Sequence, residues 1–166
     1  ILPTPTIGAV GLIVAGEDPI VGEAREGHVL LMIGDANGHL GQSALLSEVF
    51  NREDGDAPHV DLAAEKTNGE FIRANRDFIK VCTDIADGGL ALAAFEMAET
   101  AGVGVQLDSD DTATLFGEDQ GRYLVACNFD QAEALMIAAG QTRVNITSVG
   151  KFTGDHVWFG NSGAPL

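Results

Sequence analysis

The sequence predicts an α+β domain in which helices cover a mixed β-sheet. Apolar segments of strand length alternate with segments of helical periodicity along the chain, and the last two apolar segments are close enough to form a hairpin. The 166 residues, 45% of them hydrophobic, suffice for one buried core but not for two ordinary domains. We therefore expect a single domain over residues 1–166.

The first expected elements are a linker and two strands. Pro3 and Pro5 favour an extended chain, so residues 1–6 are predicted to be a linker. Residues 7–14 are apolar apart from glycine, which is typical of a central strand covered on both faces. After an irregular acidic stretch, residues 28–33 are expected to form a second apolar strand, which glycine and turn residues end.

A glycine-rich loop at residues 38–43 then leads to an expected short helix, 44–50, and a surface loop, 51–58. A longer helix is predicted to begin after Asp61, whose side chain can cap it. Side chains that recur every three or four residues predict its buried face: Val60, Ala64, Thr67, Phe71, Ala74 and Phe78.

The middle of the chain alternates again between strand and helix. Residues 79–83 are predicted to be a strand, 84–89 a turn, 90–101 a helix and 103–107 a strand. Five side chains should form the buried face of that helix: Leu90, Ala94, Met97, Ala98 and Ala101.

A short helix over residues 110–116, capped by Ser109, and a strand over 122–127 come next. A loop with acidic and amide side chains, residues 118–120, separates the two elements.

The end of the chain is predicted to contain one helix and a hairpin. Asp130 and Glu133 have the spacing of a capping box, which predicts a helix over residues 131–139. Residues 146–152 and 156–159 are expected to pair as a β-hairpin around the glycine turn between them.

The charge balance excludes several classes of partner. Nine Lys and Arg stand against 25 Asp and Glu, which gives a net charge of −16. Nucleic acids and anionic membrane surfaces are bound through basic side chains, so neither is expected as a partner. The apolar runs are also shorter than the ~18–20 residues of a spanning helix.

Cysteine and histidine usage predicts no metal centre. Cys82 and Cys127 lie in apolar runs without a Cys-x-x-Cys motif, which favours free buried thiols in a reducing cytoplasm over a disulfide or a metal site. The four histidines are not clustered, and His39 is expected to be an exposed loop residue because no nucleophile is spaced beside it.

The strongest candidate for a ligand site is the strand-to-helix turn that contains Asp84, Gly88 and Gly89. Two glycines at a helix start let backbone N–H groups approach a phosphate closely, and Asp84 could hold a divalent cation that bridges to it. The residues fit an alternative equally well, in which Asp87 only caps the helix and the glycines only turn the chain.

A second candidate is the loop at residues 38–43. Its backbone could form an anion nest at Gly41, and Ser43 could add a hydroxyl donor, although a simple turn is the commoner outcome for such a sequence.

In a third candidate, Glu118 and Gln120 could accept hydrogen bonds from a sugar or an amide. The alternative is that Glu118 and Asp119 are solvated loop charges and that Arg122 pairs with one of them.

Four motifs occur in a fixed order along almost the whole chain: Pro-Thr-Pro-Thr-Ile-Gly at 3–8, Leu-Gly-Gln-Ser at 40–43, Asp-Ile-Ala-Asp-Gly-Gly-Leu at 84–90 and Leu-Phe-Gly-Glu-Asp-Gln-Gly-Arg at 115–122. Together they resemble the phosphoribosylformylglycinamidine synthase family, specifically its last domain. The third motif alone is shared, with variations, by the wider aminoimidazole ribonucleotide synthetase superfamily.

The resemblance implies a three-layer α/β/α domain like the C-terminal domain of aminoimidazole ribonucleotide synthetase. It also implies that the chain is a piece of a larger cytoplasmic ligase, with residues 1–6 as the remnant of an interdomain linker. Such an enzyme uses ATP, Mg²⁺ and ammonia from glutamine to convert formylglycinamide ribonucleotide into its amidine. The partners would be the preceding A and B domains of the same enzyme and a glutaminase subunit or domain. No catalytic residue and no certain cofactor of its own are implied for this chain.

The resemblance carries over only a few site residues. In the family's first copy of this domain, the counterpart of Asp84 binds magnesium and the counterparts of residues 118–120 contact substrate. Asp119 stands where a small donor such as Ser is expected, and its carboxylate would repel a phosphorylated ligand. Three roles stay open: an enzyme fragment that is inactive alone, a module that binds phosphate or nucleotide weakly, and a purely structural domain.

Overall fold

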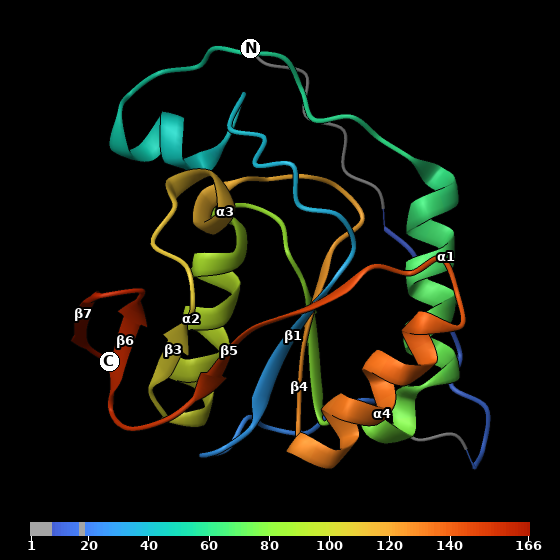
Figure 1. Cartoon of the computed structure of the whole chain (residues 1–166). Helices are drawn as coiled ribbons and strands as arrows, with labels where there is room; N and C mark the ends of the chain where they lie inside the picture. Colours follow the sequence, from blue (N-terminus) through green and yellow to red (C-terminus); the bar gives the residue numbers. More distant parts are fainter. Residues whose placement is uncertain (1–7, 17–18) are drawn as a thin grey trace.

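The computed structural model describes residues 8–16 and 19–166, which build a seven-stranded mixed sheet with helices on both faces (Figure 1). The strands are β1 (Val29–Ile33), β2 (Val81–Asp84), β3 (Val105–Leu107), β4 (Tyr123–Cys127), β5 (Ile146–Phe152), β6 (His156–Phe159) and β7 (Ser162–Pro165). Their order across the sheet is β2-β4-β1-β5-β3-β6-β7. All neighbouring pairs are antiparallel except β3 and β6, which are parallel, so the predicted mixed sheet is confirmed.

Two layers of helices enclose this sheet. On one face lies α2 (Gly89–Ala101), with the short helix α3 (Thr112–Phe116) beside it, and on the other face lie α1 (Leu62–Ala74) and α4 (Phe129–Gly140) (Figure 1). A π-helical turn, η1 (Leu45–Val49), and a 3₁₀ turn, η2 (Arg76–Phe78), complete the helical elements. The α/β/α arrangement implied by the resemblance is therefore present. No helix in the described ranges is both long enough and apolar enough to cross a membrane.

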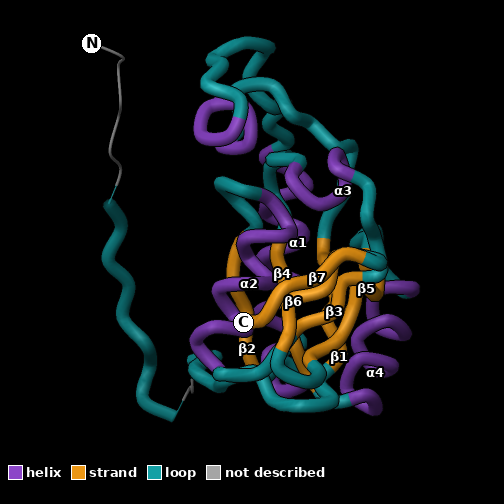
Figure 2. The backbone as a smooth tube through the Cα atoms, turned by 90° about the vertical axis from the view of Figure 1, so that its left-hand side faces the viewer, coloured by secondary structure: helices purple, strands orange, loops and turns teal. Residues whose placement is uncertain are grey.

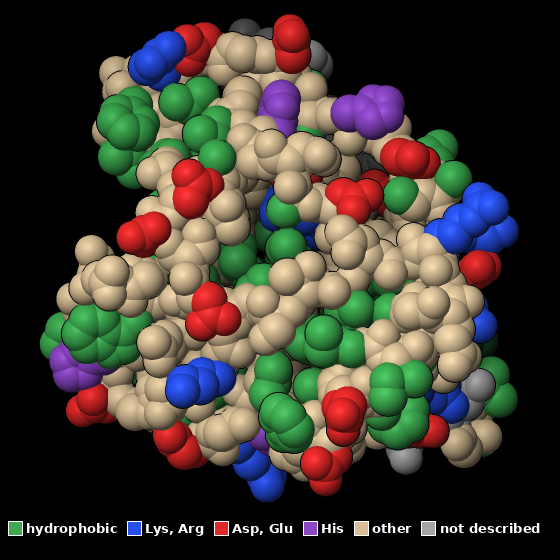
Figure 3. All heavy atoms as spheres, viewed as in Figure 1, with side chains coloured by type: hydrophobic (Ala, Val, Ile, Leu, Met, Phe, Trp, Pro, Cys, Tyr) green, Lys and Arg blue, Asp and Glu red, His purple; other side chains and the backbone are tan. Residues whose placement is uncertain are grey.

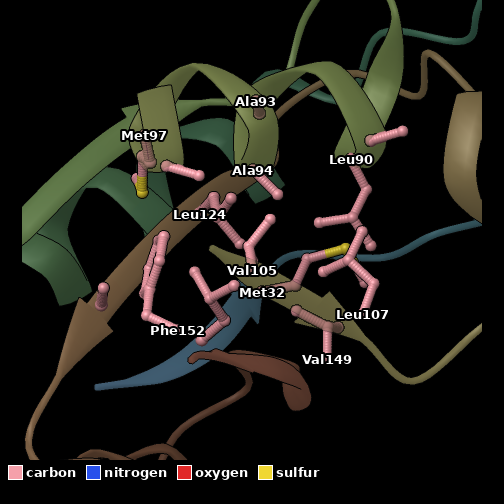
Figure 4. Packing of buried hydrophobic residues seen from close by; sticks show 14 of the residues in the cluster. Met32, Leu90, Ala93, Ala94, Met97, Val105, Leu107, Leu124, Val149 and Phe152 are labelled. Carbon is pink, nitrogen blue, oxygen red and sulfur yellow. The ribbon is translucent and has the colours of Figure 1, made fainter. Parts of the chain in front are cut away.

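The two-residue period of β1 supplies a hydrophobic core to each face of the sheet. Leu30 and Met32 belong to the cluster under α2, whereas Leu31 and Ile33 belong to the cluster under α1 and α4. Figure 4 shows the first cluster, in which side chains of α2 point down onto the strands. One strand thus holds both helical layers in place.

The predicted face of α2 is confirmed. Leu90, Ala94, Met97 and Ala98 are buried, and Ala94 and Ala98 have no exposed surface. The fifth predicted residue, Ala101, is half-buried and packs against the same cluster. Alanine side chains let the helix backbone lie close to the sheet. The two cysteines are free thiols, as predicted, and burial raises the pKa of each to about 11.

The prediction of a central strand over residues 7–14 is wrong for residues 8–14, and Ile7 lies outside the described residues. These residues form no strand, and Val10 and Leu12 are almost fully exposed. Both neighbours of β1 are already taken by β4 and β5. Apolarity signals that a segment prefers burial, but it does not say against which surface.

The predicted hairpin between residues 146–152 and 156–159 is also wrong, although both strands exist. The strand β3 lies between β5 and β6, and the hairpin is formed by β6 and β7 instead. The turn between β5 and β6 crosses the start of β3: Thr153 N donates to Gly104 O at 2.8 Å, and Gly104 N donates to Gly154 O at 2.7 Å. The strand β3, which is distant in sequence, therefore separates β5 and β6, which are adjacent in sequence.

The helix α1 begins after Asp61 as predicted, because the Asp61 carboxylate accepts hydrogen bonds from two backbone N–H groups of the first turn. Its predicted face is only partly right, since Phe71 is buried as predicted. Four other predicted positions are exposed: Val60, Thr67, Ala74 and Phe78. The buried face contains Asn68, whose Nδ2 donates to Gly121 O at 2.9 Å. Because the polar Asn68 lies on the buried face, the apolar side chains alone did not indicate which face of α1 is buried.

Two predicted caps are wrong as well. The N-cap of α3 is Asp111, not Ser109, because the Asp111 carboxylate accepts from Thr114 N at 2.8 Å. The N-cap of α4 is Asn128, and Gln131, not Glu133, accepts from the capping residue's N–H. The other predicted strands and helices lie within two residues of their observed bounds.

Replacing Ala94 by Asp should unfold or severely destabilise the domain, because the carboxylate would be buried under α2 without a partner. We expect a loss of at least about 3 kcal/mol, a large part of the ~5–15 kcal/mol that a typical domain has. Ala63→Asp, in the exposed first turn of α1, is the matched control and should change stability by less than about 0.5 kcal/mol. Urea denaturation of both variants tests this, and equal midpoints would show that the buried face of α2 is misassigned.

Candidate functional site

The loops that contain the first two candidate sites meet at the start of α2. One oxygen of Glu118, Oε1, accepts hydrogen bonds from Ala44 N at 2.7 Å and from Gly88 N at 2.8 Å. Gly88 belongs to the turn 84–89, and Ala44 directly follows the loop 38–43, so the turn and the end of that loop meet at one anion. That anion is a side chain of the protein itself.

A second carboxylate occupies the neighbouring loop in the same way. Asp119 Oδ2 accepts from the N–H groups of Asn37 and Gly38, each at 2.9 Å, and from His39 N at 3.4 Å. Successive backbone N–H groups of this kind form an anion-binding nest. Asp119 is 8% exposed, so it is not the solvated loop charge of the alternative reading. His39 is half-buried, not exposed, and its Nε2 lies 2.8 Å from Asp56 O.

Arg122 fixes the loop that carries both carboxylates. Its guanidinium is buried, with Nε donating to Asp119 O at 3.0 Å and Nη2 donating to Gly117 O at 2.5 Å. The expected ion pair with a loop carboxylate is thus replaced by bonds to backbone carbonyls. Burial lowers the pKa of Arg122, and the negative charges of Asp119 and Glu118 oppose that shift.

The two glycines at the start of α2 allow the backbones to approach one another closely. Gly88 and Gly89 have φ of +76° and +65°, which favours glycine. A Cβ on Gly89 would lie 2.7 Å from both Leu115 O and Gly117 O. The glycines therefore turn the chain and pack it, as the alternative reading holds, but the N-cap of α2 is Gly88 and not Asp87.

Local contacts already engage the predicted phosphate-binding residues of the second loop. The loop 51–58 covers Gly41, on which a Cβ would lie 2.5 Å from Asp56 O. Ser43 is 1% exposed, and its Oγ accepts from Leu46 N at 3.3 Å. Ser43 is therefore not at the surface of this chain, and the loop 51–58 lies over Gly41.

Asp84 and Gln120 are the predicted site residues that remain exposed. Within residues 8–16 and 19–166, no three His, Cys, Asp or Glu side chains gather into a group that could hold a metal ion. The magnesium role of Asp84 stays a prediction.

The sequence did not predict an apolar groove of about 450 Å³ beside these loops. Figure 3 shows hydrophobic side chains gathered over η1 at the upper left and a hollow below them. The larger side chains that line the groove come from η1, α2, α3 and β6: Leu45, Val49, Leu92, Phe95, Phe116 and Phe159. The apolar pair Leu92 and Phe95, away from the predicted face of α2, was the signal in the sequence. Glu48 is the one charged residue among those that line the groove. The groove therefore lacks the converging polar groups of a phosphosugar site.

Comparison with known proteins shows what the chain is similar to. The family model described as "AIR synthase related protein, C-terminal domain" matches residues 25–158. The phosphoribosylformylglycinamidine synthase subunit PurL of Ruegeria sp. (strain TM1040) is 78% identical over all 166 residues, which are 23% of its length. The chain thus spans about a quarter of this curated relative.

Solved structures of the same fold include T. maritima PurL complexed with FGAR, with a TM-score of 0.68, 20% identity, and coverage of 87% of this chain and 28% of that one. PurLQS from Thermotoga maritima has a TM-score of 0.65 and 17% identity over 87% of this chain and 26% of that one.

Glu118→Ala should destabilise the domain by about 1–3 kcal/mol, because two partly buried N–H groups lose their acceptor. Glu118→Gln keeps an oxygen but loses the charge, so we expect roughly half that loss. Glu133→Ala, an exposed carboxylate on α4, is the control. Urea denaturation gives the free energies, and NMR shifts of the Ala44 and Gly88 amides report on the hydrogen bonds. If Glu118→Ala matches the control, the carboxylate does not hold the loops.

Gly89→Ala should cost at least about 2 kcal/mol, because a Cβ meets backbone oxygens and disfavours positive φ. Gly140→Ala is the matched control, since a Cβ at this helical position meets open space. That change should be neutral or stabilise by up to about 1 kcal/mol. Thermal denaturation measures both, and a stable Gly89→Ala variant would contradict the close approach of the backbones.

Proposed function

Because this chain belongs to the AIR synthase related protein, C-terminal domain family, we propose that it is one domain of a phosphoribosylformylglycinamidine synthase of purine biosynthesis. The observation that carries the proposal is the 78% identity to a synthase subunit over all 166 residues. The four motifs of the sequence analysis point to the same enzyme.

The proposed parent enzyme is an ATP-dependent carbon–nitrogen ligase. It consumes formylglycinamide ribonucleotide, ATP and ammonia, and it releases the amidine, ADP and phosphate. Ammonia comes from glutamine through a glutaminase subunit or domain, and the likeness to the PurLQS structure supports such a partner. The preceding A and B domains of the same polypeptide are the other proposed partners.

For this domain we propose a structural role, with ATP and Mg²⁺ bound elsewhere in the enzyme. The N–H groups that could receive phosphate donate instead to Glu118 and Asp119. A net charge of −16 also opposes binding of a polyphosphate. The residues present therefore do not fit a nucleotide, which favours a structural domain over a nucleotide-binding module. Asp84 and Gln120 stay accessible to a ligand held by a neighbouring domain.

We also propose a cytoplasmic location for the enzyme. Free thiols persist in a reducing compartment, and both cysteines of this chain are free.

The purified 166-residue chain should neither hydrolyse ATP nor form the amidine from formylglycinamide ribonucleotide, ATP and ammonium. The full-length protein should do both, in a coupled assay for ADP and a chromatographic assay for the product. If the full-length protein lacks amidine formation, the proposed function is wrong. Turnover by the short chain at the rate of the full-length protein would overturn the division of roles between domains.

A thermal-shift measurement of the short chain with ADP and Mg²⁺ separates a structural domain from a binding module. A ligand at 100 times its dissociation constant stabilises a protein by about 2.7 kcal/mol, which raises Tm measurably. We expect no change in Tm, and a rise that increases with ADP concentration would favour the binding module.

A further inference from the structure

Residues 8–14 form an apolar segment that the domain does not bury. Val10 is 100% exposed and Leu12 is 96% exposed, and the two residues that follow are exposed by about two thirds. Figure 2 shows the segment running as an extended chain along the outside of the domain. Leu12 and Ile13 face a pocket that Ile72 of α1 also lines, but they stay largely exposed. Single exposed hydrophobic side chains are ordinary, but a continuous run of them marks an interaction site.

The order of side chains in this segment suits a strand that is covered on both faces. In an extended chain, Val10, Leu12 and Val14 project to one face, and Ala9, Gly11 and Ile13 project to the other. Both faces are apolar, which is typical of a strand inside a sheet with two covering layers. Small residues on one face would let a covering helix come close.

The sheet of this domain offers no place for such a strand near its centre. The strand β1 has β4 and β5 as neighbours, and at the free edge the segment around Gly22 already lies against the start of β2. A Cβ on Gly22 would lie 2.2 Å from Lys80 O. The family match begins only at residue 25, so the segment is not part of the matched domain.

The length of the relatives indicates what covers the segment. All 166 residues, this segment included, align with a protein of which they make up 23%, so more than three quarters of that protein lies outside the chain. A second copy of the chain is a weaker occupant, because two segments paired alone would form a two-stranded ribbon that is marginally stable in water. A sheet in the rest of the polypeptide supplies both an edge and a covering layer.

We infer that residues 8–14 form a β-strand in the sheet of a neighbouring domain of the same longer polypeptide. The inference rests on the proposal that the chain is one domain of a larger enzyme. The strand adds to the edge of that sheet through backbone hydrogen bonds, and Val10, Leu12 and Val14 pack into its core. The two domains are then joined by shared structure and not only by a linker.

Hydrogen–deuterium exchange of the full-length protein and of the 166-residue chain tests the inference directly. Amides of residues 9–14 should exchange at the unprotected rate in the short chain and at least about 100-fold more slowly in the full-length protein. Fast exchange in both would overturn the inference. Protection in the short chain that grows with its concentration would also overturn it, because a second copy would then be the occupant.

The variant Leu12→Asp supplies an independent readout. It should lower the Tm of the full-length protein and leave that of the short chain unchanged. Leu62→Asp, at an exposed leucine of α1, is the control and should leave both unchanged. Equal losses for the two variants in the full-length protein would overturn the inference. Neither measurement uses activity. An active full-length enzyme in which residues 9–14 are unprotected would overturn this inference alone. An inactive full-length protein in which residues 9–14 are protected would overturn only the proposed function.

Discussion

The loops at the end of the sheet depend on one requirement, that backbone N–H groups removed from water need an acceptor. The start of α2 and the turn before η1 both leave N–H groups without partners in their own elements, and Glu118 supplies one oxygen to both. Its neighbour Asp119 does the same for the residues after β1. Arg122 then fixes the loop between these carboxylates and β4. Two adjacent acidic residues thus hold residues 37–44 and Gly88, which are far apart in sequence.

The same arrangement explains why backbone geometry that suits a phosphate can instead serve a carboxylate of the protein itself. A nest of N–H groups is complementary to any anion of suitable size, and a carboxylate on a fixed loop has no entropic cost of association from solution. Glycines with positive φ bring the backbones close enough for this contact. The features that suggest a ligand site are then also those of a packed junction between loops.

Local signals in the sequence predicted most elements but not all of their neighbours. The face of α2 was predicted correctly because Leu90, Ala94 and Met97 follow the helical period and meet one continuous core. The prediction of a hairpin between β5 and β6 was wrong because nothing in the sequences of these two strands reveals that β3 lies between them. For the site, the sequence indicated two glycine-rich loops between a strand and a helix, each of which could bind an anion. It could not show that Glu118, thirty residues after Gly88, would be that anion.

The raised pKa of the two thiols, of which Cys127 is buried and Cys82 half-buried, has a practical consequence for chemical labelling. A thiol with a pKa of about 11 has only about one molecule in ten thousand as the reactive thiolate at pH 7. Cys82 and Cys127 should therefore react slowly with maleimides and iodoacetamide while the domain is folded. A cysteine introduced at an exposed position could then carry a fluorophore or spin label selectively, with both native cysteines left in place.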